Sequence, residues 1–308
     1  MEYRQLGKSG LKVSAIGLGT NAFGARVDES ASIKTIEYAL ELGVNFLDTA
    51  ESYAQGRSEE IVGKAIEGKR SQAVIATKFG YRRSITPKER GGSRSYMIRA
   101  LENSLRRLNT DYVDLYYLHY PDTETPVDET LRALDDLIHT GKVRYIACSN
   151  FAAWQLCEAE WTSRLHSLER FIAVQLRYNM LDRSIEKEVV PCCQAYGIGV
   201  VPWGPLASGF LTGKYARSSE TPARFSPSSG IYFDVFTKAN FEKLDKLKTF
   251  ARERSHSVGE LAVAWLLSRP WLGSVITGAT NAEQVSSNVA SGEWKLTAEE
   301  VAQLDEML

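Results

Sequence analysis

The sequence has few of the residues that would mark a disulfide-rich or metal-dependent protein. It contains four cysteines and four histidines in 308 residues. The cysteines lack the spacing of zinc ligands, and the adjacent pair Cys192 and Cys193 does not suit a simple disulfide framework. The histidines form neither an H-x-H nor an H-E-x-x-H pattern. We therefore expect reduced thiols in a cytoplasmic protein, and no catalytic metal.

Long apolar runs and an excess of one charge are also missing. The longest uninterrupted apolar run is 261–267, far short of the roughly 20 residues that cross a bilayer. Residues 1–10 lack the basic start and the apolar stretch of a signal peptide. The 37 Lys and Arg residues nearly balance the 38 Asp and Glu residues. We therefore expect a small-molecule partner, neither nucleic acid nor a membrane, and a monomer or homo-oligomer.

The sequence does contain a repeat of short β-rich runs, each followed by an amphipathic helical stretch. The predicted strands are 15–17, 45–48, 74–77, 114–118, 145–148, 172–175, 199–202 and 274–276. Helices are predicted over 32–42, over 95–108 and between Pro126 and Gly141, and Thr297 begins a capping box. Strands that alternate with helices form a parallel sheet, and eight of them close into a barrel. The prediction is an α/β fold, a single (β/α)8 barrel domain over 1–308.

Two segments depart from the repeat. Residues 3–13 form two strand-like pieces around a Gly-Lys-Ser-Gly turn, which predicts a β-hairpin plugging the N-terminal end of the barrel. Residues 204–238 are rich in Gly, Ser and Pro. Because loops of this length in compact domains are usually functional, we expect long loops at the C-terminal face, with a lid in this segment.

Four polar residues follow consecutive predicted strands, at the end of the barrel where such folds carry their active sites. Asp48 ends the second strand, Tyr53 comes five residues later, and Lys78 and His119 end the third and fourth. A lysine ammonium would lower the tyrosine pKa from about 10, an aspartate would keep the lysine charged, and an imidazole would bind a substrate oxygen. Taken alone, each of these four residues has an ordinary structural explanation, such as a helix cap or a residue of the core. Together they predict that Tyr53 protonates an oxygen that becomes an alkoxide when hydride arrives.

The sequence resembles the aldo-keto reductase superfamily over essentially its whole length. Within that superfamily it most resembles the bacterial members related to potassium-channel β subunits. The matching motifs lie, in the family's order, at 16–20, 45–53 with Gly56, Ser58, Glu59 and Gly63, 76–80, 114–119, 141–144, 149–151, 175–179, 203–209 and 278–284. The resemblance implies an NAD(P)-dependent oxidoreductase that transfers hydride between nicotinamide and an aldehyde, ketone, sugar or alcohol. It gives Asp48, Tyr53, Lys78 and His119 as the catalytic residues, with Tyr53 as general acid and base.

The resemblance also implies which residues contact the cofactor. Ser149, Asn150 and Gln175 would hold the carboxamide, Trp203 would stack on the nicotinamide, and Gln284 with Asn288 would face the adenine. The glycine-rich loop would fold over the pyrophosphate. The further expected contacts are Gly19, Thr20, Asp48, Gly204, Pro205, Leu206, Ser208, Gly209, Leu211, Lys214, Arg224, Gly278 and Thr280. Lys214 and Arg224 favour NADP(H), whereas the lack of a basic residue over 280–284 leaves NAD(H) open.

The substrate pocket is expected to contain Asn21, Phe23, Tyr53, His119 and Tyr120. The sequence fixes neither the substrate nor the direction of the reaction. Two other functions stay open. One is a cofactor-binding regulatory subunit that resembles the potassium-channel β subunits. The other is a metal-dependent hydrolase on the same barrel, against which the scattered histidines argue.

Overall fold

Eight parallel strands close into a barrel in this computed structural model, which describes residues 1–81, 91–217, 221–225 without the Arg224 side chain, and 234–308. Around the barrel the strand order is β10-β3-β4-β5-β6-β7-β8-β9. The bounds are β3 Ile16–Gly19, β4 Phe46–Asp48, β5 Val74–Phe79, β6 Val113–Leu118, β7 Val143–Ser149, β8 Ala173–Arg177, β9 Gly199–Trp203 and β10 Val275–Gly278. Each overlaps a predicted strand, so the predicted (β/α)8 barrel is confirmed.

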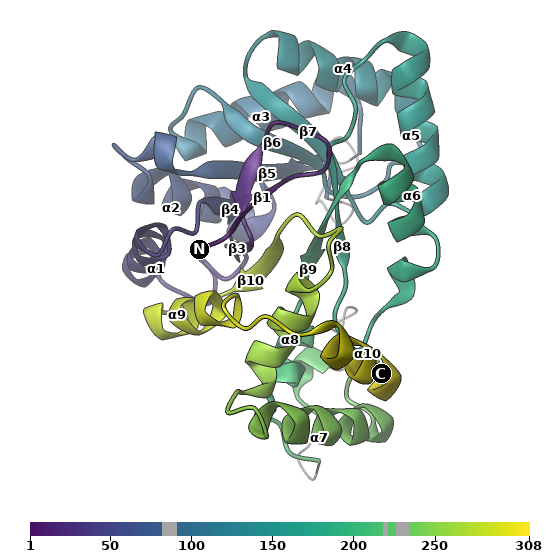
Figure 1. Cartoon of the computed structure of the whole chain (residues 1–308). Helices are drawn as coiled ribbons and strands as arrows, with labels where there is room; N and C mark the ends of the chain where they lie inside the picture. The colour runs from purple at the N-terminus through teal and green to yellow at the C-terminus, as the bar shows by residue number, and fades with distance from the viewer. Residues whose placement is uncertain (82–90, 218–220, 226–233) are drawn as a thin grey trace.

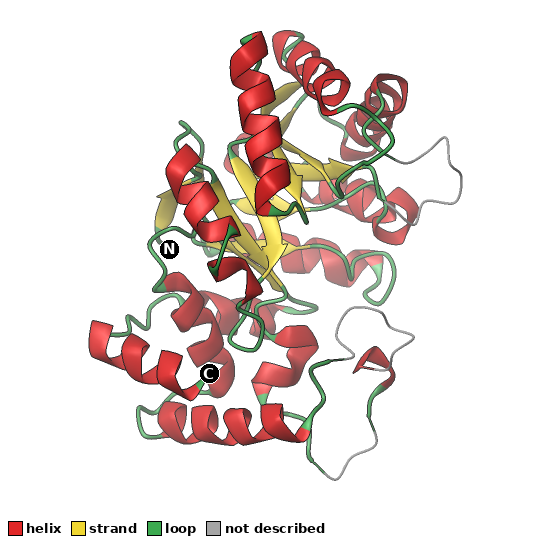
Figure 2. Cartoon of the chain, turned by 90° about the vertical axis from the view of Figure 1, so that its right-hand side faces the viewer, coloured by secondary structure: helices red, strands yellow, loops and turns green. Residues whose placement is uncertain are grey.

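Helices surround the barrel on its outside, and Figures 1 and 2 show the strands enclosed by them. Their bounds are α1 Glu29–Glu41, α2 Arg57–Ala65, α3 Arg94–Leu108, α4 Val127–His139, α5 Ala153–His166, α6 Val189–Tyr196, α7 Lys238–Arg252, α8 Val258–Leu267, α9 Ala282–Ser291 and α10 Ala298–Met307. The predicted helices α1, α3 and α4 are confirmed. The Thr297 capping box also forms, because its hydroxyl accepts from the Glu300 N–H and the Glu300 carboxylate accepts from the Thr297 N–H.

The N-terminal hairpin closes the bottom of the barrel, as predicted. Strand β1 (Tyr3–Gln5) pairs antiparallel with β2 (Lys12–Ser14). Leu6, in the turn between them, is fully buried among the side chains that fill the barrel. Gly7 has a φ of +57°, and a Cβ there would lie 2.4 Å from the carbonyl oxygen of Ile172. Glycine is therefore required where the plug meets the strand starts.

Two apolar cores follow from the alternation of side chains along the strands. On β6, Leu115 and Tyr117 point into the barrel, whereas Tyr116 between them packs in the larger core under the helices. The interior of the barrel is thus filled with side chains, and a ligand has to bind at its rim. None of the helices in the described part of the chain combines the length and apolarity needed to cross a bilayer.

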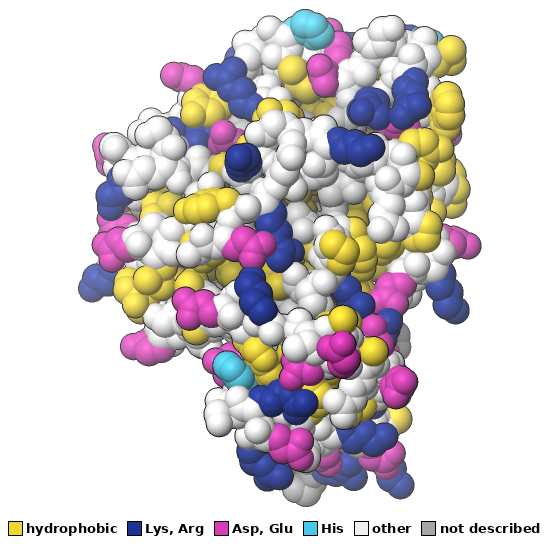
Figure 3. Space-filling view, viewed as in Figure 1, with side chains coloured by type: hydrophobic (Ala, Val, Ile, Leu, Met, Phe, Trp, Pro, Cys, Tyr) yellow, Lys and Arg dark blue, Asp and Glu magenta, His cyan; other side chains and the backbone are white. Residues whose placement is uncertain are grey.

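On the face that Figure 3 displays, basic and acidic side chains are interspersed. Ion pairs between such side chains occur in the described part of the chain, for example Arg4 with Glu2 and Lys69 with Glu37. The near balance of charges in the sequence is thus accompanied by local pairing of opposite charges.

Candidate active site

The strand register brings four inward-facing polar residues to the upper rim of the barrel. Ala76 on β5 lies inside the barrel, so Lys78, two residues further, points into its upper end. The same spacing directs the strand-end residues Asp48 of β4, Ser149 of β7 and Gln175 of β8 inward. All four are buried, with 0 to 3% of their surface exposed. The predicted convergence of these strand ends is therefore observed.

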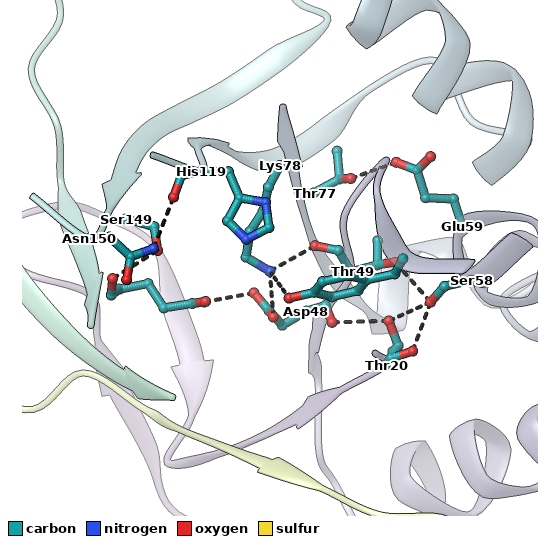
Figure 4. A network of polar contacts seen from close by, with 12 residues as sticks. Thr20, Asp48, Thr49, Ser58, Glu59, Thr77, Lys78, His119, Ser149 and Asn150 are labelled. Carbon is teal, nitrogen blue, oxygen red and sulfur yellow. Dashed lines mark hydrogen bonds and ion pairs between the residues drawn. The ribbon is translucent and has the colours of Figure 1, made fainter. Parts of the chain in front are cut away.

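Lys78 is the centre of this group (Figure 4). Its Nζ donates to Asp48 Oδ2 at 2.6 Å, to the Thr49 carbonyl at 2.8 Å and to the Tyr53 hydroxyl at 3.3 Å. The three acceptors match the three N–H donors of an ammonium. Burial disfavours its charged form, but Asp48 and Tyr53 more than offset this and raise the pKa of Lys78. The lysine is thus held charged, with one N–H aimed at the tyrosine oxygen.

Tyr53 differs from the prediction in its acidity. The pKa of its phenol is raised above 10, because burial opposes the charged form more strongly than Lys78 favours it. Lys78 lowers this pKa, as expected, but burial outweighs it, and the sequence could not show the depth of burial. Tyr53 therefore keeps its proton at neutral pH, which is the state required of a proton donor.

His119 lies beside Tyr53 at the end of β6. The two ring centroids are 6.1 Å apart with the rings nearly perpendicular, and His119 is 7% exposed. Burial and then the charge of Lys78 lower the pKa of His119 well below 6.5, so the imidazole is neutral. Its Nδ1 is buried and has no hydrogen-bond partner among the residues that the structure describes. A neutral imidazole offers one donor and one acceptor to a substrate.

Aromatic rings form a wall next to His119. The ring centroid of Tyr120, which was expected in the substrate pocket, is 5.2 Å from that of His119, and the ring of Tyr81 is also 5.2 Å away. Sequence analysis missed Tyr81, although its place directly after Lys78-Phe79-Gly80 was a usable signal. Phe23, predicted to line the pocket, is instead fully buried in the main core, so its ring is not available to a substrate. Asn21 is exposed at the end of β3.

The residues expected at the carboxamide form one hydrogen-bonded chain. Ser149 Oγ donates to the Gln175 carbonyl at 2.9 Å, and Gln175 Nε2 donates to Asp48 Oδ1 at 2.8 Å. Asn150 has a φ of +62°, and its Nδ2 is 3.0 Å from both Ser149 Oγ and the His119 carbonyl. Its Oδ1 accepts from no donor in the described residues. The structure therefore joins these residues to Asp48 and, through Asp48, to Lys78.

The loop after β9 turns sharply beside a lysine. Ala207, Ser208 and Gly209 are left-handed in succession, with φ of 45°, 56° and 87°. A Cβ on Gly209 would lie 3.1 Å from Lys214 Nζ, so the ammonium rests on this loop. Asn179 holds the start of the loop, since its Nδ2 donates to the Gly204 carbonyl at 3.1 Å. Such a run of left-handed residues beside a cation suits an anion.

The other residues around this loop that were predicted to contact the cofactor differ in how exposed they are. Leu211 is fully buried and Pro205 is buried, so they can offer only backbone to a ligand, whereas Trp203, Leu206 and Ser208 are partly exposed. The side chain of Arg224 lies outside the described residues, and so do 218–220 and 226–233 of the predicted lid.

The predicted adenosine end lies at β10 and α9. Asn281 caps α9 by accepting from the Gln284 N–H at 2.9 Å. Gln284 Oε1 in turn accepts from the Thr280 N–H at 2.9 Å, and Asn288 Nδ2 donates to the Gly278 carbonyl at 3.3 Å. Gly278 itself is exposed, with open space where a Cβ would be. The side-chain oxygen of the exposed Gln284 is thus already engaged by Thr280.

Gly19 and Thr20 lie at the end of β3. Gly19 pairs with Gly278 in the barrel register. Thr20 is fully buried, and its hydroxyl donates to the Asp48 carbonyl at 3.1 Å and accepts from Ser58 at 2.8 Å. Its hydroxyl supports the strand that carries Asp48 (Figure 4).

A second polar network involves the residues that flank Lys78 along the chain. Thr77 donates to the buried Glu59 at 2.6 Å, and Arg107 pairs with the same carboxylate at 3.0 Å. Glu51, which the sequence analysis did not single out, accepts from the Gly80 N–H at 3.1 Å and from the Tyr96 hydroxyl. Burial raises the pKa of Glu51 to about 7.

Within the described residues, no group of three His, Cys, Asp or Glu side chains could hold a metal ion.

Comparison with known proteins matches residues 15–308 to the family model described as the aldo/keto reductase family. A probable voltage-gated potassium channel subunit beta from Oryza sativa subsp. japonica is 38% identical over 299 residues, which cover 94% of this chain and 90% of that protein. Versiconal hemiacetal acetate reductase from Aspergillus parasiticus is 34% identical, covering 99% of this chain and 96% of that protein. The aldo-keto reductase YhdN of Bacillus subtilis is 34% identical, covering 100% of this chain and 94% of that protein.

Proposed function

The chain belongs to the aldo/keto reductase family and is an oxidoreductase of that family, and from this premise we propose that it transfers hydride between NAD(P)H and a carbonyl compound. The substrate class is an aldehyde, ketone or sugar in reduction, and the corresponding alcohol in oxidation. The observation that carries the proposal is the contact of the buried Lys78 Nζ with both the buried Asp48 and the half-buried Tyr53.

The residues around this contact fit a nicotinamide. A carboxamide needs both an acceptor and a donor from the protein, and Asn150 Oδ1, which accepts from no donor among the described residues, is an acceptor at the rim. Ser149 and Gln175 lie within the same hydrogen-bonded chain. The reduced nicotinamide, when bound there, would supply hydride to the carbonyl carbon of the substrate.

Tyr53 then supplies the proton. As the carbonyl oxygen gains negative charge, the Tyr53 hydroxyl donates its proton to it, and Lys78 stabilises the phenolate that remains. Asp48 keeps the lysine charged. Neutral His119 donates a hydrogen bond to the same substrate oxygen and orients it. In alcohol oxidation the Tyr53 phenolate instead accepts the proton of the substrate hydroxyl.

NADP(H) is the favoured cofactor and NAD(H) the alternative. Lys214 supports this choice, because its ammonium rests on the left-handed loop at Gly209 and would attract a phosphate. Tyr81, Tyr120 and His119 form an aromatic wall, and the exposed Asn21 would add a polar group to the same pocket. This mixture suits a substrate with both apolar and hydroxyl-bearing parts.

The decisive experiment measures nicotinamide absorbance for carbonyl compounds and sugar alcohols with NADPH, NADH, NADP and NAD. We expect turnover in the wild type and a loss of at least about a hundredfold in Tyr53→Phe, because general acid catalysis contributes roughly 10²–10⁴-fold. Cofactor affinity should be retained. Tyr116→Phe is the matched control, since this fully buried tyrosine contacts the Met97 carbonyl away from the site. Normal turnover in Tyr53→Phe would refute the proposal.

A second candidate function is a cofactor-binding regulatory subunit. The observation that favours it is the 38% identity to the protein from Oryza sativa that is described as a probable potassium channel subunit beta. Tight cofactor binding without turnover of any substrate in the same experiment would favour it. Co-purification with a membrane channel would then test it directly.

A further inference from the structure

All four cysteines of the chain gather where α5, α6 and β7 meet. Cys157 lies on α5, Cys192 and Cys193 lie on α6, and Cys148 lies on β7. Burial raises the pKa of Cys148 well above 9, and the thiols of Cys193 and Cys192 raise it further. Cys148 and Cys193 are buried, whereas Cys157 and Cys192 are half-buried. The cluster thus has an inner pair of buried thiols and an outer pair of half-buried thiols.

The two outer thiols are in contact. The Sγ atoms of Cys157 and Cys192 are 3.5 Å apart. Cys192 Sγ also lies 3.7 Å from the carbonyl oxygen of Ala153, one helical turn before Cys157, so it rests on the same face of α5. A disulfide bond is about 2.05 Å long, so the two sulfur atoms would have to approach each other by about 1.5 Å to form one.

We propose that Cys157 and Cys192 are a thiol pair that a hydroperoxide oxidises to an intramolecular disulfide joining α5 to α6. In the first step the sulfur of Cys157 attacks the peroxide, the O–O bond breaks, and a sulfenic acid forms while water or an alcohol leaves. In the second step the sulfur of Cys192 attacks the sulfenic sulfur, and the departing hydroxide takes the Cys192 proton as water. The two thiols lose two electrons in total, and the hydroperoxide accepts them.

The surroundings of the two thiols favour Cys157 for the first step and Cys192 for the second. Burial and the neighbouring Cys157 thiol raise the pKa of Cys192 to about 12. Cys192 is therefore the less reactive thiol towards peroxide, which leaves the first attack to Cys157; in the second step the hydroxide that leaves the sulfenic sulfur takes up the Cys192 proton. Neither step uses the catalytic tyrosine, lysine or histidine, so this site is independent of the proposed hydride transfer.

The disulfide would connect two helices that flank the nicotinamide side of the rim. Helix α5 begins three residues after Asn150, and α6 leads into β9, which ends at Trp203. In the unfolded chain the same bond would close a loop between positions 35 apart. Since loop closure restricts the unfolded chain, oxidation should raise thermal stability.

The test treats the reduced wild-type protein with hydrogen peroxide. We expect the four thiols that a denatured sample titrates to fall to two, and dithiothreitol to restore them. The thermal midpoint should rise by a few degrees on oxidation. Chymotrypsin cuts after Phe151 and so separates Cys148 from Cys157, and tandem mass spectrometry of the unreduced digest then identifies the linked residues. We expect a link between Cys157 and Cys192 within one chain.

Cys157→Ser and Cys192→Ser should each abolish the link and the rise in thermal midpoint. Cys193→Ala is the matched control, because it removes the adjacent thiol on α6 and should leave both results unchanged. The proposal is overturned if peroxide yields sulfinic or sulfonic acid at Cys157 without a link, a disulfide between two chains, or a link through Cys193. The wild-type digest decides between these results even if a variant does not fold.

Discussion

Gln175 donates a hydrogen bond to Asp48 across the barrel, with 2.8 Å between Nε2 and Oδ1 of residues 127 positions apart. The other carboxylate oxygen of Asp48 accepts from Lys78 at 2.6 Å. One carboxylate thus connects Lys78, which we propose is catalytic, to a residue on the side where we propose the nicotinamide binds. A change at Gln175 should therefore affect both the stability of the barrel and the proton transfer.

Gln175→Leu tests this connection. The substitution leaves Asp48 Oδ1 buried without its donor, and such an unmet hydrogen bond costs roughly 1–3 kcal/mol. We expect the free energy of unfolding in urea to fall by about that amount and kcat to decrease. Gln303→Leu makes the same chemical change at an exposed position of α10 and should have little effect on either. Equal effects of the two substitutions would contradict a role for the cross-barrel hydrogen bond.

Lys78→Met should be the most damaging single change at the site. It leaves Asp48 as a buried charge without its partner, which typically costs about 3–5 kcal/mol in the free energy of unfolding. Adding Asp48→Asn to the same protein removes the uncompensated charge and should recover part of that loss. Lys64→Met is the control, because its ion pair with Glu29 is on the surface, with 51% of the Lys64 side chain exposed. Its cost should stay below about 1 kcal/mol. A double variant no more stable than Lys78→Met would argue against the buried ion pair.

The pH dependence of turnover follows from two shifted groups. Burial and the charge of Lys78 lower the pKa of His119 well below 6.5, and burial raises that of Tyr53 above 10. Both groups then stay in the states needed for reduction, a neutral imidazole and a protonated phenol, between about pH 6 and 8. We expect kcat/KM for carbonyl reduction to be level over that range, and alcohol oxidation to rise with pH because it needs the phenolate.

His119→Asn separates these groups in a pH–rate profile. If wild-type reduction fell with acid near the ordinary histidine pKa and the fall disappeared in His119→Asn, the imidazole would be charged in the working enzyme. That result would contradict the burial argument. A level profile in both proteins, with a lower rate in the variant, agrees with a neutral hydrogen-bond donor.

Much of this site could be predicted from the sequence, because a parallel barrel collects strand ends at one rim. The strand ends at Asp48, Lys78 and His119 were predictable from short apolar runs followed by a polar residue. Tyr53 was predictable only from its closeness to Asp48 along the chain. The resemblance to a known family added the residues of the cofactor side, of which Ser149, Asn150 and Gln175 are joined to the catalytic group by hydrogen bonds.

The parts that could not be predicted depend on depth and on packing between distant segments. Phe23 comes shortly after a strand end, as a pocket residue would, yet the chain turns its ring into the core. The acidity of Tyr53 depends on a balance between burial and Lys78 that no spacing reveals. Helix α5 lacks a clean apolar face, since Trp154 and Leu165 are exposed, so its bounds were not predicted.

Glu51 should make the stability of the protein depend on pH. Burial raises its pKa from 4.5 to about 7, more than the hydrogen bonds from Tyr96 and Gly80 lower it. The folded state therefore binds this proton more tightly than the unfolded chain does. The resulting stabilisation is complete below about pH 4.5 and is lost as the pH rises through about 7, and it amounts to roughly 3 kcal/mol.

Glu51→Gln removes this titration while keeping a side chain of the same shape. We expect the free energy of unfolding of the wild type to decrease, relative to that of the variant, as the pH rises from about 5 to 8. For Glu293→Gln, at an exposed position, the free energy of unfolding should depend on pH in the same way as that of the wild type. If the free energies of unfolding of the wild type and Glu51→Gln also depended on pH in the same way, the Glu51 carboxyl would have the same pKa in the folded and the unfolded chain. That result would contradict the prediction.

Lys214 should favour the cofactor that carries the additional phosphate. Its ammonium rests on the left-handed turn at Gly209, and NADPH brings more negative charge to the site than NADH. Because Lys214 is exposed, we expect a contribution of only about 1 kcal/mol, or roughly a fivefold weaker Kd for NADPH in Lys214→Met. The loss should be smaller for NADH and should shrink at high salt. Lys34→Met, at an exposed position on α1, is the control and should change neither Kd. Equal losses for both cofactors would mean that Lys214 acts on the pyrophosphate alone, and the preference for NADP(H) would then lose its support from this residue.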